Sequence, residues 1–300
     1  MSAIDDIAID ALNQQRKHAL LNASGAHKWL NCTPSARLEE TLPESQSVYA
    51  DEGRLAHAIA ELKLRKHFIE PMGPQKFKNA LKKLQEDPLY QDEMLKHTDT
   101  YLDYVSKIVH SYPAPPYVTI EQRLDYSTFV PEGFGTGDCI IIGGSTLHVI
   151  DLKYGKGVPV SAECNPQMML YGLGAYVKYL MLYPIDQVRL TIVQPRLDSI
   201  SEWEISIHEL VQWGEKYVRP RAQRAYNGQG DFNPGEWCRF CRARATCRAR
   251  ANIHTALEDF GYKKPPLLSN AEVGEILVRA QELEKWVKDL EEYALSECLA

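Results

Sequence analysis

Two carboxylates and a lysine stand on neighbouring β-prone runs near the middle of the chain. Asp138 opens the run DCIII, and Asp151 and Lys153 close the run HVIDLK. Side chains two positions apart share one face of a strand, so Asp151 and Lys153 point the same way, while Ile150 and Leu152 point into the core. A hairpin turn at the intervening GGS would set the two strands side by side. Converging carboxylates beside a cation suit Mg²⁺ or Mn²⁺, with the lysine placed to orient or activate an attacking water.

Two helical patterns add polar side chains to this set. Gly53 and His57 lie four residues apart in one predicted helix, and Gln167 and Tyr171 lie four apart in another. Residues four apart share a helical face. An Asp-x-Lys alone is common by chance, and a lone histidine in a helix is more often structural than a ligand. The patterns therefore carry information through their order along the chain rather than singly.

Three cysteines form a second cluster of chemistry-bearing residues. Cys238, Cys241 and Cys247 make a C-x₂-C-x₅-C pattern. The N-terminus lacks the layout of an export signal, so we expect a reducing compartment, where cysteines bind metals more often than they form disulfides. Soft thiolates suit zinc or an iron–sulfur cluster, and a four-coordinate site needs one more ligand. His254, seven residues on, is the local candidate and would make a zinc site.

The four patterns of the first cluster follow the order G-x-x-x-H, G-x-x-D, D-x-K and Q-x-x-x-Y. In this order they resemble the RecB-like branch of the PD-(D/E)XK nuclease superfamily, which includes CRISPR-associated exonucleases and phage-borne relatives. The resemblance implies an α/β fold with a restriction-endonuclease-like core, whose central mixed sheet is flanked by helices. It implies metal ligands at His57, Asp138, Asp151 and the backbone carbonyl of Leu152. It also implies a catalytic set, with the glutamine and tyrosine near the DNA: Lys153, Asp151, Asp138, Gln167 and Tyr171.

That branch has a variant in which one cysteine upstream of the histidine motif and three near the C-terminus hold a 4Fe–4S cluster. Because Cys32 occupies the upstream position, the resemblance implies four cluster ligands: Cys32, Cys238, Cys241 and Cys247. The likeness then covers roughly residues 24–250. We interpret Glu121 as a solvated strand glutamate rather than an outer-shell acid. The remaining cysteines are interpreted as core or surface thiols: Cys139, Cys164 and Cys298.

Positive charge gathers in the last third of a chain whose formal net charge is −6. That average does not predict a nucleic-acid binder. Residues 216–250, however, contain nine basic and two acidic side chains, which would concentrate phosphate neutralisation there. Trp237 and Phe240 interleave with the arginines and either stack on unpaired bases or pack over the cysteine site. The expected DNA contacts are Arg239, Arg242, Arg244, Arg248 and Tyr171.

Hydrophobic periodicity and turn residues place the elements that must hold these side chains. Helices are predicted over residues 1–21, 51–68, twice within 75–110, 166–183 and 269–298, with Ser24 as the N-cap of a further short helix. Strands are predicted over 118–124, 139–142, 146–152, 188–193 and 203–207. We expect one nuclease domain over residues 1–260 that includes the cysteine segments. A helical extension over 261–300 follows, which we interpret as a packed terminal helix rather than a partner-binding one.

These features together predict a hydrolase, a Mg²⁺- or Mn²⁺-dependent DNA exonuclease that cleaves phosphodiester bonds in phage or bacterial recombination, repair or DNA processing. The expected substrate is single-stranded DNA or DNA with free ends. The chain contains no G-x-x-x-x-G-K-[ST] loop, so a partner helicase would supply unwinding, and a single-strand annealing or binding protein is a further expected partner. No run approaches the roughly 18 apolar residues of a membrane span, and we expect a cytoplasmic protein.

Two alternatives stay open at this point. The first is a non-catalytic DNA-binding or scaffold protein that retains the nuclease fold and the cluster, although the intact Asp-x-Lys argues against lost activity. The second is a zinc-ribbon interaction protein whose Asp-x-Lys is accidental. A brown colour of the purified protein would favour iron–sulfur over zinc.

Overall fold

The computed structural model describes residues 19–43, 48–256 and 268–299. Internal contacts divide the chain into two units, each built from two separate stretches of sequence. The first unit comprises residues 1–26 and 46–222, and the second comprises residues 27–45 and 223–300. The cysteine segments, which we expected within the nuclease domain, thus fall together with the C-terminal helix in the second unit.

Two predicted features lie wholly or largely outside the described residues. The helix expected over residues 1–21 falls there except for its last three residues, which are not helical, and the boundary expected between residues 260 and 261 falls there too. A third feature is corrected. The first described helix begins at Ala26, two residues after Ser24, and the Ser24 hydroxyl donates to the side-chain oxygen of Asn22 at 2.9 Å.

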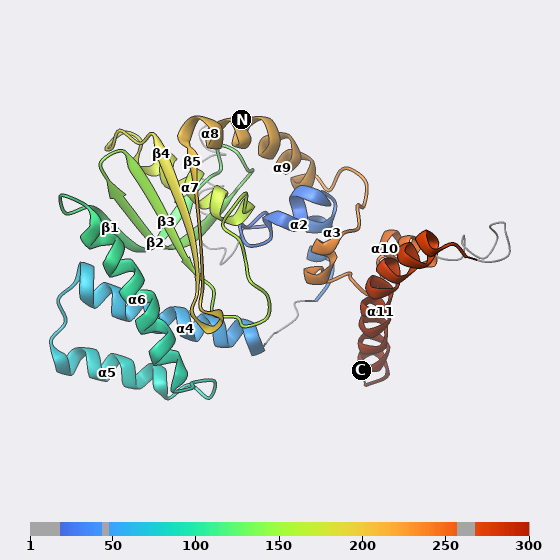
Figure 1. Ribbon diagram of the computed structural model, residues 1–300, viewed down its shortest axis with the longest axis horizontal. Coiled ribbons are helices and arrows are strands. Elements are labelled where there is room, and N and C mark those ends of the chain that lie inside the picture. Colours follow the sequence, from blue (N-terminus) through green and yellow to red (C-terminus); the bar gives the residue numbers. More distant parts are fainter. Residues whose placement is uncertain (1–18, 44–47, 257–267, 300) are drawn as a thin grey trace. The chain divides into compact units, whose positions relative to one another are not determined.

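The first unit is built around one five-stranded mixed sheet in the order β1-β2-β3-β4-β5 (Figure 1). Its strands are β1 (Tyr117–Asp125), β2 (Phe134–Gly143), β3 (Thr146–Leu152), β4 (Gln187–Gln194) and β5 (Ser199–Ser206). Neighbouring strands pair antiparallel except β3 and β4, which are parallel. A parallel pair needs a crossover, and α7 (Pro166–Tyr179) supplies it. All five predicted strands are confirmed, as is the expectation of a mixed α/β fold with a central sheet flanked by helices.

The hairpin of β2 and β3 forms at the predicted turn. Gly143 pairs with Thr146, and Gly144 in the turn has a φ of +59°, a left-handed conformation that glycine adopts without a steric penalty. β2 begins earlier than predicted, at Phe134, so Asp138 lies inside the strand rather than at its start. Two glycines precede Asp138 within the strand, and a propensity argument misses them because glycine is rare in strands.

Helices cover both faces of the sheet. α4 (Val48–Leu64) and α6 (Glu93–Ser111) pack on one face, where Leu64 and Val105 join a buried cluster with Ile150 of β3. α7 packs on the other face, where a Cβ added to Gly174 would lie 3.0 Å from Leu124 of β1. Burial on both faces explains why the inner strands are continuous runs of Ile and Val rather than alternating with polar residues.

The remaining helices of the first unit are short. They are η1 (Arg65–Ile69), α5 (Pro74–Gln85), η2 (Pro195–Leu197), α8 (Ile207–Trp213) and η3 (Gly214–Val218), and α9 (Arg219–Tyr226) begins in this unit and ends in the second. The helices predicted over 51–68 and within 75–110 are confirmed by α4 with η1 and by α5 and α6. α7 ends at Tyr179, four residues before the predicted end.

The second unit brings an N-terminal and a C-terminal segment together. Its elements are α2 (Ala26–Asn31), α3 (Ser35–Glu40), η4 (Glu236–Phe240), α10 (Arg248–Thr255) and α11 (Asn270–Leu299). Thr33 Oγ1 donates to the Gln229 carbonyl at 2.6 Å, and Arg37 Nε donates to the Tyr226 carbonyl at 2.6 Å. Side chains of the short N-terminal segment therefore satisfy main-chain acceptors of the C-terminal one.

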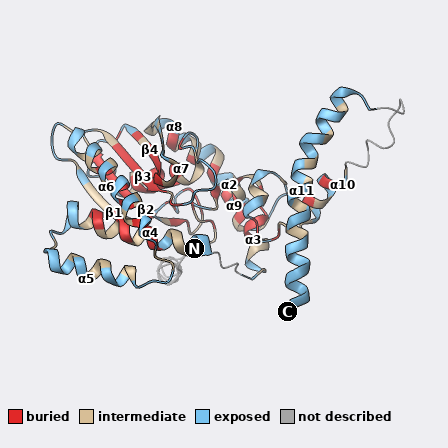
Figure 2. Cartoon of the chain, turned by 60° about the horizontal axis from the view of Figure 1, so that its bottom comes forward, coloured by how far each residue is buried: buried red, intermediate tan, exposed pale blue. Residues whose placement is uncertain are grey.

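The C-terminal helix α11 matches the helix predicted over 269–298. None of its described residues is buried (Figure 2). It is nevertheless anchored, because Trp286 Nε1 donates to the Ala245 carbonyl at 3.0 Å and its ring stacks on His254 with centroids 5.1 Å apart. Asp289 also accepts a hydrogen bond from Arg244 at 2.9 Å. These contacts agree with a packed terminal helix. Within the described chain, no helix is both long enough and apolar enough to traverse a bilayer.

A buried histidine on β3 gives the fold a testable pH dependence. His148 is fully buried, and its Nε2 lies 2.7 Å from Thr191 Oγ1 on β4. Burial, and then the charge of Arg189, lower the pKa of His148 to about 3. The unfolded chain therefore takes up a proton below a pH of about 6.5 that the folded chain does not, so the free energy of unfolding falls as the pH drops.

We expect this one group to contribute a slope of up to about 1.4 kcal/mol per pH unit between about pH 6 and pH 4. His148→Gln keeps a hydrogen-bonding partner for Thr191 and should lose that part of the slope, measured by urea unfolding at several pH values. The exposed His110→Gln variant is the control and should retain the slope. An identical slope in His148→Gln and the wild type would contradict this account.

Candidate active site

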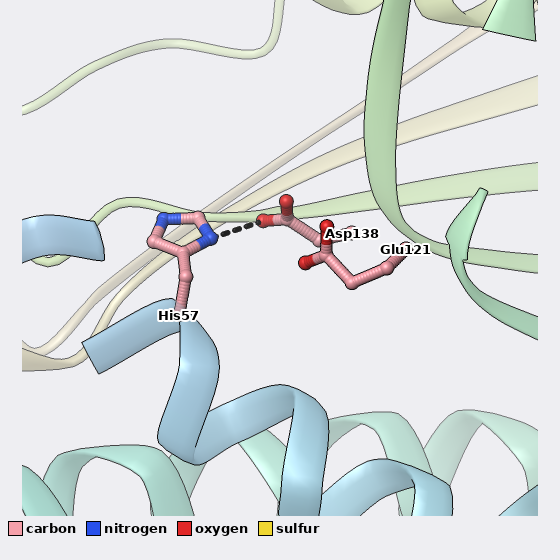
Figure 3. Close-up of side chains that lie close together, drawn as sticks. All are labelled: His57, Glu121 and Asp138. Carbon is pink, nitrogen blue, oxygen red and sulfur yellow. Dashed lines mark ion pairs between the residues drawn. The ribbon is translucent and has the colours of Figure 1, made fainter. Parts of the chain in front are cut away.

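Three potential metal ligands from three elements lie close together (Figure 3). His57 comes from α4, Glu121 from β1 and Asp138 from β2, and one ligand atom of each lies within 4.8 Å of the others. His57 Nδ1 is 3.3 Å from Asp138 Oδ2. The sequence predicts His57 and Asp138 as ligands of one metal, and the structure brings their side chains together.

Glu121 owes its place in this group to the backbone. Its φ is +49°, a left-handed conformation that costs a non-glycine residue on the order of 1–3 kcal/mol. The regular pairing of β1 and β2 is interrupted at this residue, and the strand changes face there: Ile120 packs with α4 and α6, whereas Leu124 packs against α7. The structure corrects the interpretation of Glu121 as a solvated strand glutamate, because its carboxylate lies beside His57 and Asp138.

The charges of these three side chains depend on one another. Burial favours a neutral His57, but the Asp138 carboxylate outweighs it and raises the pKa of His57 to about 9. Burial also favours a neutral Asp138, yet the His57 imidazolium and the Leu152 N–H, 2.7 Å from Oδ2, hold the pKa of that carboxyl below its usual value. Burial, and then the charge of Asp138, raise the pKa of Glu121 to about 7. Such crowded, partly desolvated carboxylates favour a cation beside them.

The predicted catalytic side chains form a hydrogen-bonded group between β3 and α7. Lys153 Nζ lies 3.0 Å from Asp151 Oδ2 and donates to Gln167 Oε1 at 2.9 Å. Gln167 Nε2 donates to Asp151 Oδ1 at 3.2 Å and to Tyr171 OH at 3.4 Å. The expectation that Asp151 and Lys153 share one strand face is confirmed, and so is the shared helical face of Gln167 and Tyr171.

The start of α7 fixes Gln167, and a glycine of β2 makes room for Tyr171. The Asn165 side chain caps the helix by accepting from the backbone N–H groups of Gln167 and Met168, which satisfies donors that a helix end leaves free. A Cβ added to Gly135 would lie 2.8 Å from the Tyr171 ring. Tyr171 itself is buried, with 8% of its surface exposed. Its hydroxyl accepts from Gln167, and its expected contact with DNA stays a prediction.

The two groups of side chains meet where β2 pairs with β3. Leu152, whose carbonyl the resemblance assigns to the metal, donates its N–H to Asp138 Oδ2. Asp151 lies outside the group of ligand atoms within 4.8 Å. Burial raises the pKa of its carboxyl and outweighs the Lys153 ammonium, which lowers it, while the charge of Asp138 adds to the rise. Asp151 Oδ2 is buried and accepts no well-directed hydrogen bond from the described residues, although the Lys153 ammonium is near. Oxygen ligands with one unsatisfied carboxylate oxygen beside them fit a hard divalent cation.

The second unit gathers four cysteines from its two segments. One cavity is lined by all four: Cys32, Cys238, Cys241 and Cys247. All four are free thiols. Of the other cysteines, Cys139 is buried in the sheet, whereas Cys164 and Cys298 are exposed, as predicted for core and surface thiols. The cavity lies within the second unit, so the cysteine cluster and the carboxylate cluster belong to different units.

Backbone amides point at these sulfur atoms. The Asn233 amide favours the thiolate form of Cys32, and the Gly235 N–H lies 3.4 Å from Cys238 Sγ. Burial is the larger effect and raises the pKa of Cys32, and it raises the pKa of Cys241 to about 12. Without a cation, buried sulfurs stay protonated. Converging buried sulfurs with amide donors fit thiolate ligands of a soft metal centre, whose binding releases the protons.

His254, the local alternative for a fourth ligand, is placed elsewhere. It is not among the residues that line the cysteine cavity, and its ring stacks on Trp286 of α11. Cys32 lines the cavity in its stead. The zinc site built on His254 is therefore not the arrangement that the structure forms, although four thiolates can bind zinc as well as iron.

The arginines predicted to contact DNA divide into two pairs. Arg244 forms salt bridges with two acidic residues of α11, and Arg242 donates to main-chain carbonyls at the end of α3 and beyond it. Both side chains therefore hold the second unit together. Arg239 and Arg248 are exposed and form no salt bridge within the described residues. The DNA contacts of all four arginines stay a prediction.

Two aromatic residues of the cysteine segment differ in the same way. Trp237 lines the cavity and donates Nε1 to the Asn233 carbonyl at 2.7 Å. Phe240 is 75% exposed, with the Arg239 guanidinium 5.5 Å from its ring centroid. Of the two alternatives drawn from the sequence, packing over the cysteines holds for Trp237. The ring of Phe240 faces solvent.

The chain matches the sequence profile of a family described as "Protein of unknown function (DUF2800)" over residues 18–300. Since the match covers most of the chain, the protein belongs to this family. A solved structure described as "Crystal structure of SSO0001" is similar over 73% of this chain and 95% of the other, with 18% sequence identity and a TM-score of 0.27. A likeness at that level carries no argument about function.

The position of Glu121 leads to a prediction about metal binding. We expect Glu121→Gln to weaken Mn²⁺ binding by about tenfold or more, as Asp138→Asn should, because each removes one anionic oxygen from the same group; even outer-shell substitutions at metal sites cost about 10–100-fold. Titration calorimetry with Mn²⁺ would measure the affinities. Glu163→Gln, an exposed glutamate of the same unit, is the matched control. Unchanged affinity in Glu121→Gln, with a loss in Asp138→Asn, would leave Glu121 outside the metal site.

Proposed function

We propose that this chain is a metal-dependent DNA exonuclease of the RecB-like branch of the PD-(D/E)XK superfamily. The observation that carries the proposal is the hydrogen-bonded group of Asp151, Lys153 and Gln167, which lies beside the His57–Asp138 pair. The reaction is hydrolysis of phosphodiester bonds in single-stranded DNA or at free DNA ends. Its setting is phage or bacterial recombination, repair or DNA processing.

A Mg²⁺ or Mn²⁺ ion fits the acidic half of this site. His57, Glu121 and Asp138 offer ligand atoms within 4.8 Å of one another, and Asp151 offers a buried oxygen that lacks a well-directed hydrogen bond from the described residues. The Leu152 carbonyl is a further expected ligand. When bound, the ion supplies Lewis-acid chemistry to the scissile phosphate and to the attacking water.

Lys153 is the residue placed to counter the negative charge that develops on the phosphate. Its side chain is only 29% exposed, and its ammonium is held between Asp151 and Gln167. A charge that is already oriented and partly desolvated needs little reorganisation when substrate arrives, which is the condition under which electrostatic stabilisation is strongest. Gln167 fixes the direction of the ammonium, and Tyr171 in turn fixes the Gln167 amide.

The four cysteines of the second unit fit a 4Fe–4S cluster with a structural role. Thiolate ligands suit both iron–sulfur and zinc, and the resemblance to the cluster-bearing RecB-like variant favours iron–sulfur. The ligands come from two segments that lie far apart along the chain, so a bound centre links them directly. Folding of the second unit should therefore be coupled to loading of the centre.

The expected partners follow from the proposed nuclease activity. DNA is the substrate, and a helicase, or a single-strand annealing or binding protein, would present it to the nuclease. We propose a cytoplasmic location, in a bacterium or in the host of a phage. A nuclease assay with Mn²⁺ on end-labelled single- and double-stranded DNA tests the proposal. Binding without cleavage would point to the scaffold alternative, and neither binding nor cleavage would end the proposal.

The catalytic assignment leads to a prediction about two isosteric variants. Asp151→Asn and Lys153→Met should each lower the cleavage rate by about a hundredfold or more, because the first removes an anionic ligand of the metal ion and the second removes the ammonium that counters charge on the reacting phosphate. Circular dichroism and DNA binding should stay close to the wild type. Lys178→Met, an exposed lysine of α7, is the matched control. Full activity in either site variant at equal metal concentration would remove these residues from the mechanism.

The cysteine assignment leads to a prediction about metal content. Cys32→Ser and Cys238→Ser should both lose bound iron and solubility, because they contribute to one centre from opposite ends of the chain. Cys164→Ser, an exposed thiol, should keep both. Metal analysis by mass spectrometry, with the visible absorbance of the purified protein, measures the outcome. A full iron load in Cys32→Ser would show that the upstream ligand is misassigned, and a colourless protein with one zinc would replace iron–sulfur by zinc.

A further inference from the structure

We propose that the outer face of the helical run α8–η3–α9 binds single-stranded DNA by stacking, at a site separate from the metal ligands. Three planar side chains form a ladder on this face: Trp213, Tyr217 and Arg221. The rings of Trp213 and Tyr217 are stacked, with centroids 6.3 Å apart and an interplanar angle of 16°. The Arg221 guanidinium carbon lies 3.7 Å from the Tyr217 ring centroid. This inference rests on the proposed function, since it names how the same enzyme holds its DNA.

The backbone explains why the ladder is presented to solvent. Each of the three ladder residues is followed in the sequence by a buried residue. These buried residues have the same spacing of four and form a stripe: Gly214, Val218 and Ala222. At Gly214 a Cβ would lie 2.8 Å from Phe129, so the helix approaches the core too closely for a side chain. Trp213, Tyr217 and Arg221 are each half-buried, so none of the three is enclosed in the core. η3, which follows Trp213 and contains Tyr217, is a π-helical turn, a feature that is rare in helices and frequent at functional sites.

The helical run that bears the ladder also carries positive charge without acidic partners among the described residues. Residues 213–222 contain Lys216, Arg219 and Arg221 against a single acidic residue. Within the described residues none of these three bases forms a salt bridge, whereas two arginines of the second unit are neutralised by Asp289 of α11. A chain of net charge −6 thus presents a local cationic strip next to stacked rings. Proteins that hold single strands combine these two features.

The chemistry favours a single strand over a duplex. A flat ring or guanidinium can receive only a base whose face is accessible, and duplex bases already stack on one another. The cations beside the ladder then neutralise phosphates of the same strand. Stacking is tolerant of base identity, so we expect little dependence on sequence. The alternative role of the ladder is to stabilise its own helix through contacts between residues four apart.

Binding of labelled oligothymidylate to the full chain tests the ladder. The strand has about 20 nucleotides, longer than one stacking site, and anisotropy is measured without added Mg²⁺ or Mn²⁺. Trp213→Leu should raise Kd by about fivefold to a hundredfold, and Trp213→Phe, which keeps a flat ring, should stay within about threefold of the wild type. Arg221→Gln should weaken binding and lower its salt dependence by about one counterion.

Fluorescence locates the base more directly. The chain has five tryptophans, and DNA should quench part of their emission through Trp213. That quenching should disappear in Trp213→Phe and persist in Trp203→Phe, a half-buried tryptophan of β5 that serves as the matched control. This pair keeps the test decisive even if Trp213→Leu fails to fold by circular dichroism. Equal quenching in the two phenylalanine variants would overturn the ladder.

The remaining outcomes separate this inference from the nuclease proposal. Cleavage of end-labelled DNA with Mn²⁺ is measured in parallel on the wild type. Binding that is unchanged in Trp213→Leu and Arg221→Gln, in a protein that cleaves, would overturn the ladder alone. Binding that depends on the ladder, in a protein that does not cleave, would overturn the nuclease proposal alone. A wild type that fails to bind oligothymidylate, or that prefers duplex to it, would overturn the ladder whatever the cleavage result.

Discussion

The arrangement of the first unit depends on two buried carboxylates on adjacent antiparallel strands. Asp138 and Asp151 would each be costly by several kcal/mol as uncompensated charges, so each takes a donor or a cation from another element. α4 supplies the His57 imidazole, the residue after β3 supplies the Lys153 ammonium, and α7 supplies the Gln167 amide. The placement of α4 and α7 against the sheet is therefore tied to the charges of Asp138 and Asp151. Shifting either helix would leave a buried carboxylate without the partner that compensates its charge.

The second unit has a comparable dependence between its own segments. Its N-terminal segment contributes one thiol and its C-terminal segment contributes three, and hydrogen bonds are donated between the two segments in both directions. Acidic side chains of α11 form salt bridges with arginines that a count of charges along the sequence would assign to DNA binding. Counting charges along a sequence thus overstates the positive surface of this unit. The cations left without acidic partners in the described chain lie in part on η3 and α9 of the first unit, where aromatic rings accompany them.

Much of the fold and part of the site follow from local rules. The hairpin, the inner strands and the shared face of Asp151 and Lys153 follow from turn residues and from the two-residue period of a strand. Glu121 does not, because its position depends on a left-handed backbone, which nothing in the local sequence predicts for a glutamate within a strand. The ion pairs of α11 also escape prediction, since periodicity places the helix but not the surface it packs on. A single sequence does not predict the roles of residues that act through tertiary contacts.

Because the second unit is built from two separate stretches of sequence, its two parts are synthesised at different times. Cys32 leaves the ribosome well before Cys238, with the whole strand-bearing stretch of residues 46–222 between them. At about 5–20 residues per second, on the order of 10–40 s pass before the other three thiols emerge. The sheet can therefore fold before the segment that carries Cys32 meets the segment that carries the other three cysteines. Closure of the cysteine cluster therefore follows synthesis of the whole sheet, and a chain interrupted between residues 222 and 238 would contain every strand but lack the three later thiols.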